Sequence, residues 1–491
     1  MAKVRGWERL ARAEEEALRN DPDDVWARVR LGAIYIREGK YYKAEKQLSR
    51  AAAEMPTPVV LGPEGRINYA QEPPQGALPP WARVAGPQGQ DLLPRYILIL
   101  HHLGEGRGGE ALSLSEDLLK GSPGDPLAVV LRARALELRG DGAAAEEALQ
   151  GALEEAGQHP LILYRLGLLY REAEKHGQAS SLFRKALSLA PDFRDARRGL
   201  ALSLLAAGNP EEALPPLREA LKEEPGDGAL HNALGEALKA LGRDEEAVSA
   251  FREGVRLSGG VVEYRLNLAN LLQELGRKEE ASEAFAEAGR LGRGNARALL
   301  AAARLKGTLG DIKAARSLIA EGLRISPEEK VPFYLLEAEL LLEQGRGEAA
   351  LDMLRRAQRE APTDAEVVLR LAGLYEDIHR PYLASAGYRR YLRLKPEGSA
   401  GDSLEQRAQG LEKEFEAEIE RLMHSAQEAE ALRRIKEDLA EIPDDPLLNL
   451  LLGRALLALG FIEEGRRALG LAEASFGDDP RYRLALAAYF M

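Results

Sequence analysis

Apolar and polar residues follow one another along most of the chain at the spacing of an amphipathic helix. In residues 160–193, PLILYRLGLLYREAEKHGQASSLFRKALSLAPDF, two apolar-rich runs flank the polar stretch REAEKHG. Each run places its apolar residues three or four positions apart, so they share one face of a helix with 3.6 residues per turn. The pattern predicts a pair of amphipathic helices joined by a short turn.

The same pattern returns every 34 residues. Seven alanines from Ala111 to Ala315 mark this period, and four glycines from Gly208 to Gly310 keep it as well. Alanine lets two helices approach closely, and glycine supplies the positive φ that ends a helix. The repeat predicts helix pairs that stack on their neighbours without a single central core. Few aromatic residues and no alternating run of Val, Ile and Thr point to an essentially all-helical chain.

The residues at fixed places in this unit identify a family resemblance. Counted from Pro160, positions 7, 8, 11, 20, 24, 27 and 32 hold Leu166, Gly167, Tyr170, Ala179, Phe183, Ala186 and Pro191. The unit resembles the tetratricopeptide repeat (TPR), whose pattern has Leu-Gly, Tyr, Ala, Phe, Ala and Pro at those places. The resemblance covers nearly the whole chain. It implies an all-α, right-handed solenoid whose first helices line a concave groove.

The phasing divides the chain into units. Repeats are expected to begin near Val25, Leu92, Pro126, Pro160, Arg194, Gly228, Val262, Ala296, Val331, Ala365 and Pro446. We therefore expect an N-terminal capping helix (1–24), a TPR unit (25–56), an irregular insert or degenerate repeat (57–91), nine consecutive units (92–398), an enlarged charged repeat (399–445), a further unit (446–479) and a C-terminal capping helix (480–491).

Two stretches break the period. Residues 57–90 are rich in Pro and Gly and have no helical spacing. They are read as a surface loop, with Tyr69 and Trp81 against neighbouring helices, or as a binding element that folds into the groove. The second break, Pro396 to Pro443, spans 47 residues, 13 more than a unit needs. It fits an enlarged repeat within the stack or a projecting coiled-coil arm.

One local conflict occurs inside a regular unit. Pro215 and Pro216 lie within an expected second helix. Proline removes a backbone donor and clashes with the preceding turn. The sequence predicts a kink or a late start in this helix.

Charge and composition limit the kinds of partner, site and location expected for the chain. The net charge of −12 opposes sequence-independent binding to nucleic acid, which needs an excess of Lys and Arg. The chain has no cysteine and therefore neither disulfides nor thiolate metal sites. The N-terminal sequence lacks the apolar core of a signal peptide, and no apolar run is long enough to span a bilayer. We expect a cytoplasmic protein without membrane insertion, monomeric or weakly oligomeric.

The sequence offers little evidence for a catalytic or cofactor-binding site. Residues 104–109, GEGRGG, match the dinucleotide fingerprint G-x-G-x-x-G, but they lie at a turn between two helices rather than between a strand and a helix. The seven histidines are scattered, and the adjacent His101 and His102 point about 100° apart on a helix. The sequence predicts no catalytic, cofactor-binding or metal-binding residues.

The TPR resemblance implies that positions 2, 5, 6, 9, 12 and 13 of each first helix face the groove. Mid-chain, these positions hold polar residues, and the candidate partner-binding set is Asn232, Glu236, Lys239, Asn267, Asn270, Gln273, Arg297 and Arg304. Side-chain amides can grip the backbone of an extended peptide, and arginines add a preference for acidic residues. The row is similar in part to the asparagine-lined superhelix of O-linked N-acetylglucosamine transferases, with only Asn267 at the strict ladder position.

Other first helices place aliphatic residues at groove positions, which would suit the docking of a helix. One set is Leu127, Val130 and Leu131, and a second is Leu335, Leu336 and Leu342. No three successive units supply the residues of the carboxylate clamp of Hsp90-binding TPR domains.

The sequence thus predicts a non-catalytic scaffold or adaptor that binds a peptide or helix of a partner protein in a concave TPR groove. The alternative is a substrate-recognition or assembly-chaperone subunit of a multi-subunit enzyme complex, similar to a glycosyltransferase. RNA binding is a third hypothesis, opposed by the acidic charge.

Overall fold

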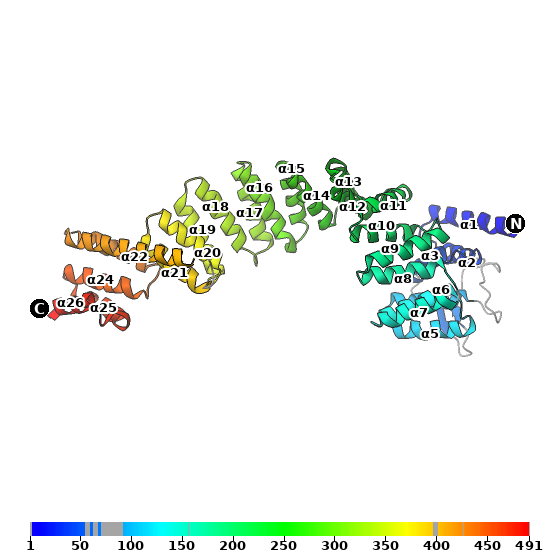
Figure 1. Ribbon diagram of the computed structural model, residues 1–491, viewed down its shortest axis with the longest axis horizontal. Coiled ribbons are helices and arrows are strands. Elements are labelled where there is room, and N and C mark those ends of the chain that lie inside the picture. The colour runs from blue at the N-terminus through cyan, green and yellow to red at the C-terminus, as the bar shows by residue number, and fades with distance from the viewer. Residues whose placement is uncertain are drawn as a thin grey trace. The chain divides into compact units, whose positions relative to one another are not determined.

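The computed structural model describes residues 2–54, 59–61, 67–69, 92–155, 157–395, 401–425 and 427–490. Helices make up almost all of these residues, as expected for an all-α solenoid (Figure 1). The chain divides into two compact units, Met1–Tyr264 and Arg265–Met491, which we call unit 1 and unit 2 and describe separately. Their boundary falls inside the helix α14 (Val262–Glu274).

Unit 1 begins with three helices, α1 (Ala2–Asn20), α2 (Val25–Arg37) and α3 (Tyr41–Glu54). It continues after the insert with the pairs α4 (Leu93–Gly104) and α5 (Gly108–Gly121), α6 (Pro126–Leu138) and α7 (Gly142–Glu155), α8 (Pro160–Glu172) and α9 (His176–Leu189), α10 (Arg194–Ala206) and α11 (Pro210–Glu223), and α12 (Gly228–Ala240) and α13 (Asp244–Leu257).

The insert holds the one departure from all-helical structure among the described residues. Two short strands, β1 (Val59–Leu61) and β2 (Ile67–Tyr69), pair antiparallel with Val60 opposite Asn68, and they lie beside α4. The rest of the predicted 57–91 insert, with Trp81, lies outside the described residues.

Unit 2 continues the helix pairs. It contains α15 (Lys278–Arg290), the 3-10 helix η2 (Arg293–Asn295), α16 (Ala296–Thr308), α17 (Ile312–Ile325), α18 (Val331–Glu343), α19 (Gly347–Glu360), α20 (Ala365–Asp377), α21 (Pro381–Leu394), α22 (Gly401–His424), α23 (Glu428–Leu439), α24 (Pro446–Ala458), α25 (Ile462–Phe476) and α26 (Pro480–Phe490).

Large side chains of the second helices hold the pairs in register. The fully buried ring of Phe183 in α9 lies so close to Gly167 in α8 that a Cβ there would come within 2.8 Å of it. The same ring meets Gly199 in α10, the first helix of the next pair, at an equally short distance. Because only glycine leaves room at both places, one ring joins its own pair to the following one.

The helix ends are set by turn glycines and capping aspartates. Gly208 and Gly242 adopt φ of 77° and 69°, in the left-handed region that favours glycine. Asp125 and Asp227 accept hydrogen bonds from backbone N–H groups in the first turns of α6 and α12. The GEGRGG stretch includes the end of α4, the turn 105–107 and the start of α5.

The first helices begin at the residues that the repeat phasing gives, except that α4 begins at Leu93 rather than Leu92. The late start expected for the helix with Pro215 and Pro216 is wrong, since α11 begins at Pro210 and runs unbroken to Glu223. Pro215 is exposed and Pro216 partly so, while Leu214 and Leu217 are buried. The helix therefore tolerates both prolines on its solvent side.

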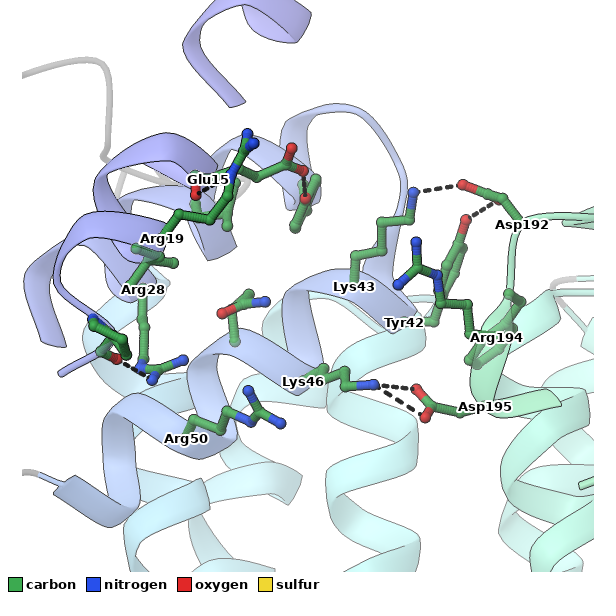
Figure 2. Close-up of a pocket in the computed structure, with 16 residues that line it drawn as sticks. Glu15, Arg19, Arg28, Tyr42, Lys43, Lys46, Arg50, Asp192, Arg194 and Asp195 are labelled. Atoms are coloured by element: carbon green, nitrogen blue, oxygen red, sulfur yellow. Dashed lines mark hydrogen bonds and ion pairs between the residues drawn. The ribbon is translucent and has the colours of Figure 1, made fainter. Parts of the chain in front are cut away.

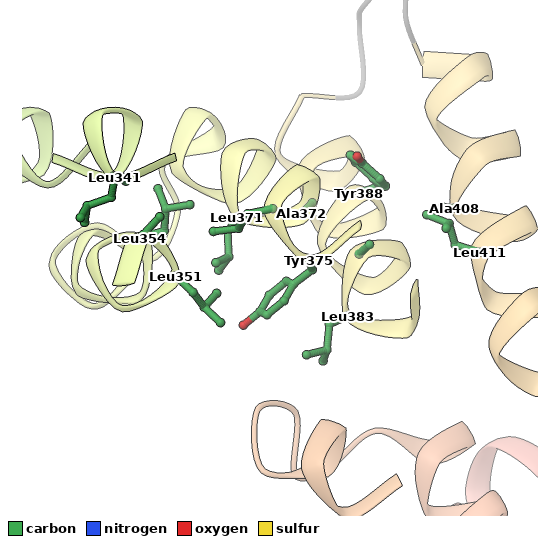
Figure 3. Packing of buried hydrophobic residues seen from close by; sticks show 14 residues of the cluster. Leu341, Leu351, Leu354, Leu371, Ala372, Tyr375, Leu383, Tyr388, Ala408 and Leu411 are labelled. Carbon is green, nitrogen blue, oxygen red and sulfur yellow. The ribbon is translucent and has the colours of Figure 1, made fainter. Parts of the chain in front are cut away.

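The long helix α22 belongs to the stack and does not project from it. Its Ala408 and Leu411 join a core formed by α18 to α21 (Figure 3). Further along, Phe415 and Ile419 pack with Ile435 of α23 and with α24. The stacked alternative for this segment is the one observed.

Candidate functional site

The surface formed by the first helices of the pairs, which we call the first-helix wall, carries the residues predicted to bind a partner. The eight candidates divide between the units. Asn232, Glu236 and Lys239 lie on α12 in unit 1, while Asn267, Asn270, Gln273, Arg297 and Arg304 lie on α14 and α16 in unit 2.

The group on α12 is largely engaged within the helix. Asn232 is only 6% exposed, and its amide donates to Glu236 at 2.7 Å. Glu236 and Lys239 are partly exposed. Since the Asn232 amide is buried and bonded, it offers little to an incoming peptide.

The group in unit 2 faces solvent. Asn270 and Gln273 are exposed on α14, and Asn267 is half-buried. Arg297 and Arg304 are exposed on α16, where neither forms a hydrogen bond or ion pair with another described residue. The two arginines are seven residues apart, about 10 Å along the helix, and so point from the same face.

The aliphatic positions differ in the same way. Leu127, Val130 and Leu131 on α6 of unit 1 are fully buried. In unit 2, Leu336 is buried, Leu335 is partly exposed, and Leu342 at the end of α18 is 41% exposed. The first-helix wall of unit 1 is therefore covered at α6, whereas that of unit 2 is partly open at α18.

The cover in unit 1 is α3. This helix packs not only on α4, its successor in the stack, but also on α6 and α8. Its Glu45 accepts a hydrogen bond from Arg134 of α6 at 3.0 Å. Its Tyr41 meets His159, the N-cap of α8, edge to face with ring centroids 5.5 Å apart. The chain's own helix thus lies across three successive first helices.

Contacts with the start of α10 extend the cover to a fourth first helix. Tyr42 stacks on Phe193 with ring centroids 4.2 Å apart, and its hydroxyl donates to Asp192. Lys43 pairs with Asp192, and Lys46 pairs with Asp195 at 3.1 Å (Figure 2). Burial alone would raise the pKa of Asp192, but the hydrogen bonds from Lys43 and Tyr42 outweigh it and lower that pKa below its ordinary value.

Sequence reasoning missed this contact. It expected helix docking at Leu127, Val130 and Leu131, but not that the docked helix precedes them in the same chain. A signal exists in the spacing of Tyr42, Lys46 and Arg50, four residues apart and on one face of a helix. Nothing in the spacing names their partners, because Asp192 and Asp195 lie about 150 residues later.

The described residues show no arrangement typical of a metal or membrane site. No group of three or more His, Asp or Glu side chains among them is placed to hold a metal ion. His101 and His102, considered in the sequence, have ring centroids 6.2 Å apart and tilted planes. Within the same part of the chain, no helix has the length and apolar character needed to cross a bilayer.

Comparisons with known proteins find solved structures that resemble parts of the chain. Chain segments are similar to solved structures of MamA from Desulfovibrio magneticus RS-1 (22% identity, 34% of this chain and 94% of that chain, TM-score 0.33). They are also similar to YrrB, described as a TPR protein with an unusual peptide-binding site (22% identity, 36% of this chain and 91% of that chain, TM-score 0.33). No curated protein is similar enough to count as a match.

Family models give the identification. One tetratricopeptide repeat model matches residues 164–228 and 200–261, a second matches 102–166 and 308–374, and a third matches 262–289. Together they span more than half of the chain, and the matched segments consist of the observed helices. The chain is a helical scaffold of the general kind used in protein interaction, and it belongs to the tetratricopeptide repeat family.

Proposed function

We propose that the protein is a non-catalytic scaffold that binds an acidic, extended segment of a partner protein on the first-helix wall of unit 2. The observation that carries the proposal is the pair Arg297 and Arg304, exposed on one face of α16 without a carboxylate partner among the described residues. An exposed guanidinium binds carboxylate through two parallel hydrogen bonds, which gives a preference for Asp and Glu.

The exposed amides of α14, in the same unit, supply the second part of recognition. Asn270 and Gln273 are exposed, and each offers both a donor and an acceptor. Such groups bond to the N–H and C=O of an extended backbone whatever its sequence. The partly exposed Leu335 and Leu342 on α18 would accept an apolar side chain of the same segment. A cytoplasmic location stays a prediction of the sequence.

The test is direct binding of a fluorescein-labelled peptide, EELEE, to the full chain, followed by fluorescence anisotropy. Replacing both arginines (Arg297→Gln with Arg304→Gln) should raise the Kd of the peptide for the protein about tenfold, because two charge-assisted contacts are lost. The matched control replaces Arg324 and Arg359, exposed on the second helices α17 and α19, by Gln. Equal affinity of the two double variants would refute the proposal.

A further inference from the structure

A cavity of about 620 Å³ lies in unit 1 between α1, α2, α3 and the start of α10 (Figure 2). It exists because α3 is docked, since that helix forms one of its walls. Three carboxylates line it, those of Glu15, Asp192 and Asp195. Six cations line it as well, namely Arg19, Arg28, Lys43, Lys46, Arg50 and Arg194. This local excess of positive charge stands in a chain with net charge −12.

Half of these cations already have carboxylate partners within hydrogen-bonding distance. Lys43 pairs with Asp192, Lys46 with Asp195, and Arg28 with Glu54 at 3.2 Å. Their charges are therefore largely balanced by the fold and contribute to the docking of α3.

The other three cations are arginines without such a partner. Arg19 bonds only to the backbone carbonyl of Glu15, at 3.4 Å. Arg50 is exposed and has no carboxylate partner among the described residues. Arg194 forms only a long ion pair with Glu223, at 3.7 Å, beyond hydrogen-bonding distance. Three guanidinium groups from α1, α3 and α10 thus line one cavity, and none of them has a hydrogen-bonded carboxylate among the described residues.

We propose that this cavity is a second partner-binding site, which takes an acidic peptide segment whose carboxylates bind Arg19, Arg50 and Arg194. Its volume is within the range of sites that enclose a small ligand or a few residues of a peptide, roughly 300–1,000 Å³. This inference rests on the proposed function, because it assumes that the chain binds protein segments.

The residues that line the cavity favour a peptide over a free phosphate. Carbon surface from Leu18 and Pro22 lies among the cations and would pack against an apolar side chain. Gln47 also lines the cavity, and its buried Oε1 has no hydrogen-bond partner among the described residues. That oxygen can accept from a backbone N–H once the side chain turns toward the cavity. A phosphate would use the cations alone.

The experiment separates this site from the wall of unit 2. In the full chain that already carries Arg297→Gln and Arg304→Gln, the remaining binding of fluorescein-labelled EELEE is measured by anisotropy. Adding Arg19→Gln and Arg50→Gln should weaken that binding about tenfold. The matched control adds Arg107→Gln and Arg218→Gln, two exposed arginines of unit 1 outside the cavity.

Equal binding by the two quadruple variants would overturn this inference and leave the proposed function standing. Inositol hexakisphosphate is titrated in parallel. If it binds in a manner that depends on Arg19 and Arg50 while EELEE does not, the cavity takes phosphates and the peptide assignment is wrong. Circular dichroism checks the fold. Should the Arg19 and Arg50 changes disturb α1 or α3, Arg194→Gln on α10 provides the same test.

Discussion

The first-helix walls of the two units are built from the same repeat but differ in accessibility. In unit 1, α3 covers the wall through Tyr41, Tyr42, Glu45 and Lys46. In unit 2, Leu342 and the polar residues of α14 and α16 stay open to solvent. The repeat therefore fixes the scaffold, while the side chains at groove positions and the segments beside them decide whether a wall is free.

The covered wall also shows what a free wall accepts. The docked α3 combines an aromatic stack, buried aliphatic positions beneath it and ion pairs at the edge. This is the helix-in-groove mode of recognition, formed within one chain. A partner helix that binds the part of the unit 1 wall covered by α3 has to displace α3, whereas a segment that binds the wall of unit 2 does not.

The largest expected effect comes from Phe193, which is 2% exposed and packs between Tyr42 of α3 and Tyr164 of α8. Phe193→Ala should destabilise unit 1 by about 3–5 kcal/mol, because it leaves a cavity in the docking contact. Hydrogen exchange should show loss of protection in α3, with unit 2 unchanged.

Phe251→Ala is the matched control for Phe193→Ala. Phe251 is equally buried in unit 1 and packs on Gly235, away from α3. It should cost a similar free energy without exposing α3 preferentially. If both variants reduce the hydrogen-exchange protection of α3 to the same extent, Phe193 is not a specific anchor for α3. The docking of α3 then depends only on the overall stability of unit 1.

Most of the fold could be predicted from the sequence, because in a repeat protein each helix pair depends on local spacing and on its neighbours. Pro160, Gly228 and Pro446 begin helices in the structure as the phasing requires. The strands β1 and β2 had no such signal, since three-residue strands in a Pro- and Gly-rich segment do not repeat.

Less of the candidate site could be predicted. The positions facing the first-helix wall follow from the repeat, but their exposure depends on contacts distant in sequence. Asn232 and Asn270 are predicted to lie in one row of groove residues, yet Asn232 is buried and Asn270 is exposed. The docking of α3 depends on Asp192 and Phe193, which no local pattern connects to Tyr42.

The next largest expected effect is a loss of stability of unit 1 at low pH. His159 caps α8 by accepting a hydrogen bond from the N–H of Leu161 at 3.3 Å, and it lies under Tyr41 of α3. Burial lowers the pKa of His159 from 6.5 to about 4. The unfolded chain therefore binds a proton near pH 6.5 that the folded chain resists until about pH 4. The free energy of unfolding of unit 1 should fall by about 2 kcal/mol across this window as the pH is lowered.

His159→Asn separates the contribution of His159 to the pH dependence of stability from that of carboxylates that titrate in the same pH range. Asparagine keeps an acceptor at the N-cap but does not titrate. Urea unfolding of both proteins between pH 7 and pH 4 should give a shallower pH dependence for the variant. Parallel curves would show that His159 does not couple protonation to the covered wall.

The third prediction reverses the edge charges of α3. In Lys43→Glu with Lys46→Glu, the pairs with Asp192 and Asp195 become repulsive. These pairs are about a third or more exposed, so the total loss of docking free energy should be only about 1.5 kcal/mol. Hydrogen exchange of α3 at low salt measures it, and 1 M salt should reduce the difference.

Restoring complementarity tests the assignment of these pairs. Adding Asp192→Lys and Asp195→Lys should recover part of the protection of α3. Protection that stays low in the fourfold variant would mean that the two lysines act on their own helix rather than across the contact.

The smallest expected effects come from the two asparagines that the sequence placed in one row. Asn232→Ala removes the 2.7 Å bond to Glu236 inside α12 and should cost about 1 kcal/mol of stability. Asn270→Ala changes an exposed residue and should alter stability by less than about 0.5 kcal/mol. Binding of the EELEE peptide should show the opposite order, weakened by Asn270→Ala and unaffected by Asn232→Ala. Should Asn232→Ala weaken binding instead, its amide leaves Glu236 to meet the peptide, and unit 1 then has an open part of its own wall at α12, which would narrow the difference in accessibility between the two units.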